Sequence, residues 1–86
     1  MMTERILIVD DEEDIREILQ FNLENAGYDT DTASSAEEAL KKINSGHRLI
    51  LLDVMMEGMS GFEMAEELRR KGDETPIIFL TARSAQ

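Results

Sequence analysis

Three short apolar runs, each followed directly by a polar residue, constrain the fold of this chain more than any other feature of its sequence. The runs cover residues 6–9, 49–52 and 76–80. The residues that follow them are Asp10 and Asp11, Asp53, and Thr81. Strands without polar residues are typical of parallel sheets, which are covered on both faces. Residues 28–33 instead alternate polar and apolar side chains, which predicts a fourth strand near the sheet edge.

The segments between the strands are predicted to be helices, because their apolar residues recur with a period near 3.6. Ser35 with Glu38, and Ser60 with Glu63, have the spacing of a capping box at a helix N-terminus. The expected helix ends are Gly27, Gly46 and Gly72. The order is then βαβαβαβ, which right-handed crossovers turn into a parallel sheet with helices on both faces. We therefore predict a single α/β domain over residues 1–86.

The polar residues at the strand ends are expected to share one pocket. Ligands of open α/β sheets bind beyond the carboxyl ends of the strands, where the strand order reverses. Asp10, Asp11, Asp53 and Thr81 all occupy such ends. Gathered carboxylates repel one another and favour a bound cation, and Mg²⁺ prefers oxygen ligands of this kind. A carboxylate in such a pocket can also act as a nucleophile towards phosphorus.

Composition narrows the class of partner. The formal net charge of −10 opposes direct nucleic-acid binding, because affinity for the phosphate backbone comes largely from Lys and Arg. The chain contains no cysteine, which excludes disulfides and a thiolate metal site. Its apolar runs are too short for a signal-peptide core or a membrane span, so a soluble cytoplasmic protein is expected.

Four short motifs, in this order along the chain, resemble those of the receiver domains of bacterial response regulators. They are Ile8-Val9-Asp10-Asp11-Glu12, Leu51-Leu52-Asp53-Val54-Met55-Met56, the Gly58-Met59-Ser60-Gly61 turn and Leu80-Thr81-Ala82. The resemblance covers residues 3–83 and implies the flavodoxin-like fold of receivers. It also implies that Asp53 takes a phosphoryl group from a phosphohistidine on a sensor histidine kinase, as a phosphoacceptor rather than as a turnover enzyme.

The resemblance implies a role for each site residue. Asp11 binds Mg²⁺ directly, Asp10 acts mainly through water, and the nucleophile Asp53 is also a ligand. The backbone carbonyl of Met55 completes the protein ligands, and Thr81 senses the phosphoryl group. The start of the first helix faces the kinase, and its candidate contacts are Asp14, Ile15 and Ile18.

This sequence also departs from the family pattern. Glu57 stands where receivers commonly have proline, and Arg48 where aspartate often precedes the third strand. A complete receiver continues with a helix, a strand that carries an essential lysine and a final helix, whereas this sequence stops at Gln86. We therefore expect a receiver without the C-terminal third of the fold. Strand 77–80 then becomes an exposed edge, which favours dimerisation or domain swapping.

Two functions remain open at this point. The chain is either a signalling receiver or a receiver fragment that acts only as an interaction or dimerisation module. A haloacid-dehalogenase-type phosphatase also uses an aspartate nucleophile but requires Asp-x-Asp after its first strand, where this chain has Asp10-Asp11-Glu12. His47 is expected in a solvated loop. Core gaps are expected to be filled by Met55, Met56, Met59 and Met64.

Overall fold

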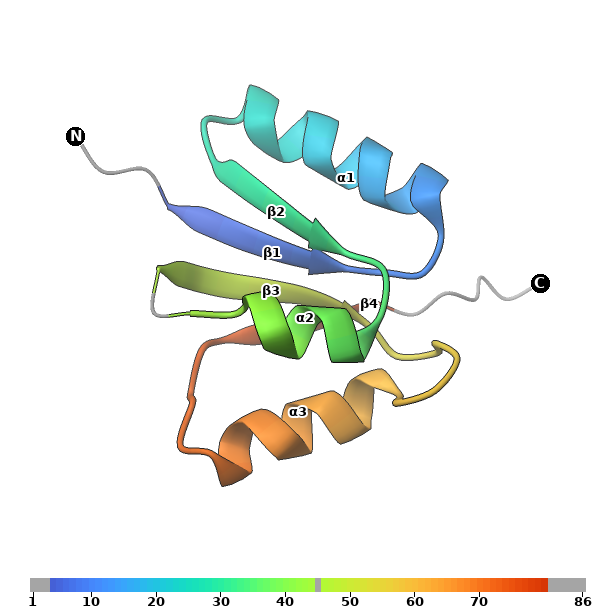
Figure 1. Cartoon of the computed structure of the whole chain (residues 1–86). Helices are drawn as coiled ribbons and strands as arrows, with labels where there is room; N and C mark the ends of the chain where they lie inside the picture. Colours follow the sequence, from blue (N-terminus) through green and yellow to red (C-terminus); the bar gives the residue numbers. More distant parts are fainter. Residues whose placement is uncertain (1–3, 45, 81–86) are drawn as a thin grey trace.

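Strands and helices alternate along the whole of the described chain. The computed structural model describes residues 4–44 and 46–80. The elements are β1 (Arg5–Val9), α1 (Glu13–Asn25), β2 (Asp29–Ala33), α2 (Ala36–Lys42), β3 (His47–Asp53), α3 (Gly61–Arg70) and β4 (Ile77–Leu80). Figure 1 shows this order from the blue N-terminal strand to the orange α3. The predicted βαβαβαβ order is confirmed.

The four strands form one parallel sheet in the order β2-β1-β3-β4. The central pair is β1 and β3, with Ile8 beside Leu51 and Val9 beside Leu52. Strand β2 lies at one edge, as its alternating sequence predicted, and β4 lies at the other. This strand order is that of the flavodoxin-like folds, in which the order reverses between β1 and β3. The predicted fold class is therefore confirmed.

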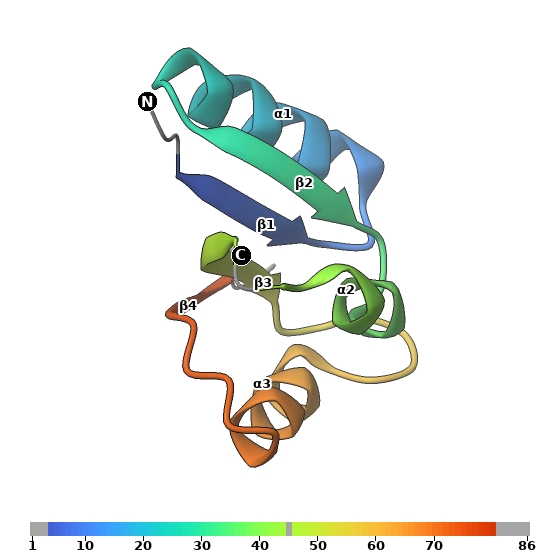
Figure 2. The ribbon, with the colours of Figure 1, turned by 60° about the vertical axis from the view of Figure 1, so that its left-hand side comes forward.

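Helices cover both faces of the sheet, with α1 on one side and α2 and α3 on the other (Figures 1 and 2). The larger core lies under α2 and α3. Its fully buried large side chains include Leu7, Val9, Ile50 and Leu52 of the strands and Met64 and Leu68 of α3. On the other face Leu19 and Leu23 of α1 pack against Ile6, Ile8 and Leu51. Continuous apolar strands are needed because successive side chains alternate between these two cores.

Most predicted helix ends agree with the structure. Ser60 and Glu63 form a reciprocal capping box at α3, and Gly27 and Gly72 follow α1 and α3 with φ of 100° and 88°. Ser35 and Glu38 form only half of a capping box at α2. The Ser35 hydroxyl accepts a bond from Glu38 N, but the Glu38 carboxylate accepts from Ser34 instead.

Helix α2 ends earlier than predicted. Its last residue is Lys42, and the C-cap Ile43 is extended, so Gly46 is not the residue that stops it. Ile43 packs against the larger core from this extended conformation. The chain therefore leaves the helix before the glycine, and the partly buried Ile43 packs on the core from outside the helix.

The expectation that His47 lies in a solvated loop is wrong. His47 is the first residue of β3, and its side chain is fully buried. Its Nδ1 accepts a bond from Asn44 N at 3.2 Å, and its Nε2 lies 2.8 Å from Asp31 Oδ2. The imidazole therefore joins β2 to the turn before β3, across the end of β1, and has a structural role.

Strand β4 presents apolar side chains at the sheet edge, as predicted. Within residues 46–80 it pairs with β3, through Ile78 beside Leu51 and Phe79 beside Leu52. Ile78 is 52% exposed and Phe79 is 39% exposed. The Phe79 ring contacts Phe62 of α3, with a centroid distance of 4.9 Å.

Candidate functional site

Three carboxylates meet where the strand order reverses. Asp10 directly follows β1, Asp11 begins the turn into α1, and Asp53 is the last residue of β3. Because β1 and β3 are neighbouring parallel strands, their carboxyl ends bring residues that are 43 positions apart to one sheet edge. One carboxylate oxygen from each of the three lies within 4.8 Å of the other two. The predicted convergence of these three residues is therefore what the structure shows.

The cluster combines two buried carboxylates with one that faces solvent. Asp10 is 5% exposed and Asp53 is 2% exposed, whereas Asp11 is exposed. Backbone amides orient the buried pair, since Glu12 N donates to Asp10 Oδ1 at 2.9 Å and Met55 N donates to Asp53 Oδ1 at 3.2 Å. The site is thus open on the Asp11 side and fixed at its base.

Burial raises the pKa of Asp10 and of Asp53 above the ordinary aspartate value. The backbone bonds from Glu12 and Met55 lower each pKa, but mutual repulsion with the neighbouring carboxylates adds to the increase. Clustered carboxylates of this kind are stabilised by a hard cation that accepts oxygen ligands. The donor set therefore fits Mg²⁺.

The β3–α3 loop leaves the site through a close backbone crossing. Gly61 N donates to Val54 O at 3.0 Å, and a Cβ on Gly61 would lie 2.2 Å from Asp53 O. Only glycine fits there, because the first turn of α3 lies directly against the residue that ends β3. The same loop is tied to α2, since Met59 N donates to Glu37 Oε2 at 3.3 Å.

A shallow hollow of about 480 Å³ lies beside the carboxylates. It is lined by Asp11, Val54, Met55, Met56, Glu57 and Ser60. The Met55 side chain is 66% exposed, so its predicted role in filling the core is wrong. Met64 is buried in the core, and Met56 and Met59 pack against it, as expected. Met55 lies outside the core because the loop turns there towards solvent.

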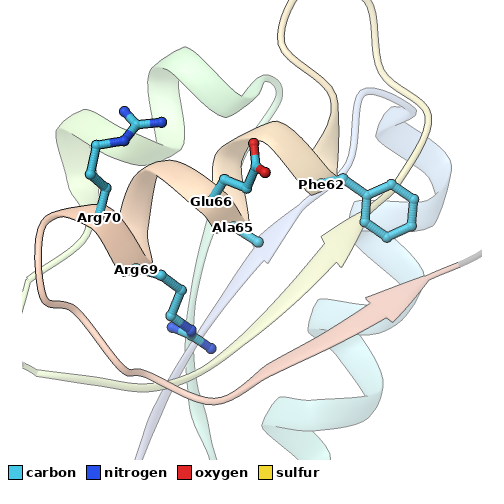
Figure 3. Close-up of a pocket in the computed structure, with 5 residues that line it drawn as sticks. All are labelled: Phe62, Ala65, Glu66, Arg69 and Arg70. Atoms are coloured by element: carbon cyan, nitrogen blue, oxygen red, sulfur yellow. The ribbon is translucent and has the colours of Figure 1, made fainter.

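A second hollow, of about 540 Å³, lies along α3 and contains none of the carboxylates. Its lining residues are Phe62, Ala65, Glu66, Arg69 and Arg70. Figure 3 shows Phe62 and Arg69 on the side of α3 that faces β4, with Arg70 pointing away. None of its lining residues belongs to the carboxylate cluster. We therefore do not assign the candidate site to this hollow, although it is larger than the one beside the carboxylates.

One further residue of the site has no counterpart in the motifs. Arg16 of α1 donates from Nη1 to the backbone carbonyl of Asp10 at 2.9 Å. It is the only Lys or Arg between residues 6 and 40. This isolation is visible in the sequence and could have marked Arg16 as a candidate site residue. Thr81 lies outside the described residues, so its predicted place beside Asp53 stays a prediction. The backbone carbonyl of Met55 likewise remains a predicted ligand.

Taken together, the fold and the acidic cluster define a flavodoxin-like α/β domain with a candidate cation site at its switch point. The family model of the response regulator receiver domain matches residues 6–86. This chain belongs to that receiver-domain family. Within the described residues, no helix is both long enough and apolar enough to cross a membrane.

Curated relatives of the chain include transcriptional regulatory proteins. The alkaline phosphatase synthesis transcriptional regulatory protein PhoP of Bacillus subtilis is 48% identical over 86 residues, which are 99% of this chain and 36% of PhoP. The CpxR homolog of Haemophilus influenzae is 43% identical over 92% of this chain and 34% of its own length. The chain therefore spans about a third of the length of these relatives.

Solved structures resemble the chain over most of its length. TrrA of Thermotoga maritima in complex with Mg²⁺-BeF superposes with a TM-score of 0.87 at 52% identity, covering 95% of this chain and 72% of TrrA. TrrA in complex with the histidine kinase ThkA gives a TM-score of 0.86 at 51% identity, over 96% of this chain and 72% of that chain. The chemotaxis protein CheY4 of Vibrio cholerae gives 0.89 at 34% identity, over 98% and 72%.

Proposed function

We propose that this chain is a signalling receiver that accepts a phosphoryl group on Asp53 from a phosphohistidine of a sensor histidine kinase. The convergence of Asp10, Asp11 and Asp53 within 4.8 Å carries the proposal. Membership of the receiver family supports it, as does the similarity to TrrA, whose structures contain Mg²⁺-BeF or a histidine kinase. The proposed receiver domain comprises residues 1–86.

In the proposed reaction an oxygen of the Asp53 carboxylate attacks phosphorus. The phosphorus–nitrogen bond to the donor imidazole breaks, its electron pair stays on nitrogen, and an acyl phosphate forms on Asp53. The Met55 amide fixes the orientation of the Asp53 carboxylate for this attack. Mg²⁺, when bound, supplies positive charge against the phosphoryl oxygens. Asp10, Asp11, Asp53 and the Met55 carbonyl are the proposed ligands, and Thr81 is the proposed hydroxyl donor to the phosphoryl group.

The kinase is proposed to contact the first part of α1. Ile15 is 36% exposed and Ile18 is 56% exposed, and both lie in the helix that begins beside the carboxylates. Asp14, in the first turn, is the adjoining polar contact. The net charge of −10 supports the further proposal that the chain does not itself bind nucleic acid. A cytoplasmic location is proposed from its membership of the receiver family.

Phosphorylation of the purified protein tests the proposal. Incubation with MgCl₂ and a small acyl-phosphate donor should add the mass of one phosphoryl group, and the adduct should disappear on mild alkaline treatment. Asp53→Asn should give no adduct, because an amide is not a nucleophile towards phosphorus, while keeping the bond from Met55 N. An adduct of equal yield on the Asn variant would exclude Asp53 as the acceptor.

A second candidate function, an interaction or dimerisation module, is favoured by the exposure of Ile78 and Phe79 on the edge strand. We propose that the edge of β4 mediates self-association, since unpaired strand edges pair readily with another chain. The solution mass of the same sample distinguishes the two. A dimer that forms no adduct would favour the module, whereas an adduct at either mass supports the receiver.

A further inference from the structure

Arg16 is the one basic residue in a long acidic part of the chain. Its neighbours along the sequence include Glu12, Glu13, Asp14 and Glu17, and no other Lys or Arg occurs between residues 6 and 40. It lies near the start of α1, where the positive end of the helix dipole disfavours a cation. Its side chain is nevertheless half-buried and turns back to the end of β1. A specific interaction must therefore hold it there.

That interaction is with the residue that begins the acidic site. Asp10 N donates to Ala33 O at 3.1 Å, and Asp10 Oδ1 accepts from Glu12 N at 2.9 Å. Arg16 Nη1 donates to the third polar group, the Asp10 carbonyl, at 2.9 Å. Asp10 is thus fixed through its amide, its carboxylate and its carbonyl. Only the Arg16 contact brings a full positive charge.

The charge of Arg16 lies beside one of the residues that are proposed to hold the cation, since its Nη1 donates to the Asp10 carbonyl at 2.9 Å. Without a cation, the carboxylates of Asp10, Asp11 and Asp53 repel one another at less than 5 Å. A nearby guanidinium offsets part of that repulsion. A bound divalent cation offsets more of it and is itself repelled by the guanidinium.

We propose that Arg16 is a positioning residue and a built-in counter-ion of the acidic site, which holds the β1–α1 turn in place while no divalent cation is bound. This inference rests on the proposed function, because it concerns the same cation site. Arg16 then stabilises the cation-free protein more than the loaded one. By linkage it also lowers the affinity for Mg²⁺.

The test compares urea unfolding of three variants in chelator and in saturating MgCl₂. Arg16→Gln removes the charge, and Arg16→Lys keeps the charge but loses the guanidinium geometry. Arg69→Gln is the matched control, because Arg69 Nη1 donates to the Asp73 carbonyl at 2.8 Å and Arg69 lies in the last turn of α3, at the end of the helix away from the site. Mg²⁺ affinity is measured in parallel by titration calorimetry, which does not depend on phosphorylation.

For Arg16→Gln we expect a lower unfolding midpoint in chelator and a clearly smaller loss in MgCl₂. The Mg²⁺ dissociation constant of this variant should fall by about threefold, as expected for removing one charge near the site in partly screened solvent. Arg16→Lys should keep the parent affinity. Arg69→Gln should lose the same stability in both solutions.

Two results would overturn the inference, and only the second would also contradict the proposed function. An equal loss for Arg16→Gln in chelator and in MgCl₂, with unchanged affinity, would mean that Arg16 only ties the turn together. In that case the parent would still be stabilised by Mg²⁺, and the proposed function would stand. A parent that Mg²⁺ does not stabilise at all would remove the cation site and this inference with it.

Discussion

Replacement of Gly61 by alanine should destabilise the protein by about 3 kcal/mol or more, because the new methyl group overlaps main-chain atoms that cannot move independently. The added Cβ would lie 2.2 Å from Asp53 O and 3.0 Å from Val54 Cα. Relief requires α3 to move away from the end of β3, which would also break the bond from Gly61 N to Val54 O. A domain of this size has only about 5–15 kcal/mol of stability to lose. Equilibrium urea unfolding measures the change.

Gly72→Ala is the control for the Gly61 prediction. Gly72 has φ of 88° and no atom within 4 Å of an added Cβ, so alanine there meets backbone strain alone. That strain costs about 1–2 kcal/mol. Equal losses for the two variants would show that the close crossing at Asp53 does not constrain the fold.

Asp10→Asn should stabilise the cation-free protein at neutral pH by roughly 1–2 kcal/mol, since it removes one of three mutually repelling charges. The amide oxygen can still accept the bond from Glu12 N. The same variant should gain less than the parent from added MgCl₂, because it has lost one of the carboxylates proposed to hold the cation. Thermal unfolding in chelator and in MgCl₂ checks both effects.

The pH dependence of the parent in chelator follows from the same charges. Asp10 and Asp53 have raised pKa values in the folded state, so the stability they contribute is present at low pH and is lost as pH rises through those values. Lowering the pH from neutral should therefore stabilise the protein at first. Glu38 and Asp73 act in the opposite sense, with the pKa of Glu38 lowered to about 2, so their contribution is lost below about pH 4.

Asp10→Asn should flatten the rise in stability between neutral pH and mildly acidic pH, because it removes one of the two carboxyl groups that produce it. The acidic fall below about pH 4 should remain, since Glu38 and Asp73 are unchanged. A parent that loses stability steadily from pH 7 downward in chelator would contradict the raised pKa values.

The strand order and the acidic cluster were predictable because their signals are local. Short apolar runs between amphipathic segments leave few alternatives to a parallel α/β sheet. In such a sheet, the residues that follow the runs must all lie at the edge formed by the carboxyl ends of the strands. The proximity of Asp10 and Asp53 could therefore be predicted without any information about the orientation of their side chains.

Interactions between distant side chains were not predictable in this way. The buried His47 side chain is paired with Asp31, which lies in β2. The pattern of residues along β3 alone gives no indication of this partner. The Glu38 carboxylate accepts from the backbone amide and the hydroxyl of Ser34 rather than from the Ser35 amide, so it does not complete a capping box with Ser35. The isolation of Arg16 among acidic residues is visible in the sequence. Its bond to the Asp10 carbonyl is visible only in the structure.

Paramagnetic broadening by Mn²⁺, a divalent ion with the same preference for oxygen ligands, tests most directly whether the three carboxylates form one site. Small additions of MnCl₂ to ¹⁵N-labelled protein should first broaden the amide signals of Asp11, Val54 and Met55, and excess MgCl₂ should restore them. The amides of Gly27 and Gly72, at the other ends of the helices, should stay sharp. Broadening spread evenly over the acidic surface, or its persistence in the Asp53→Asn, Asp11→Asn double variant, would contradict a shared cation site.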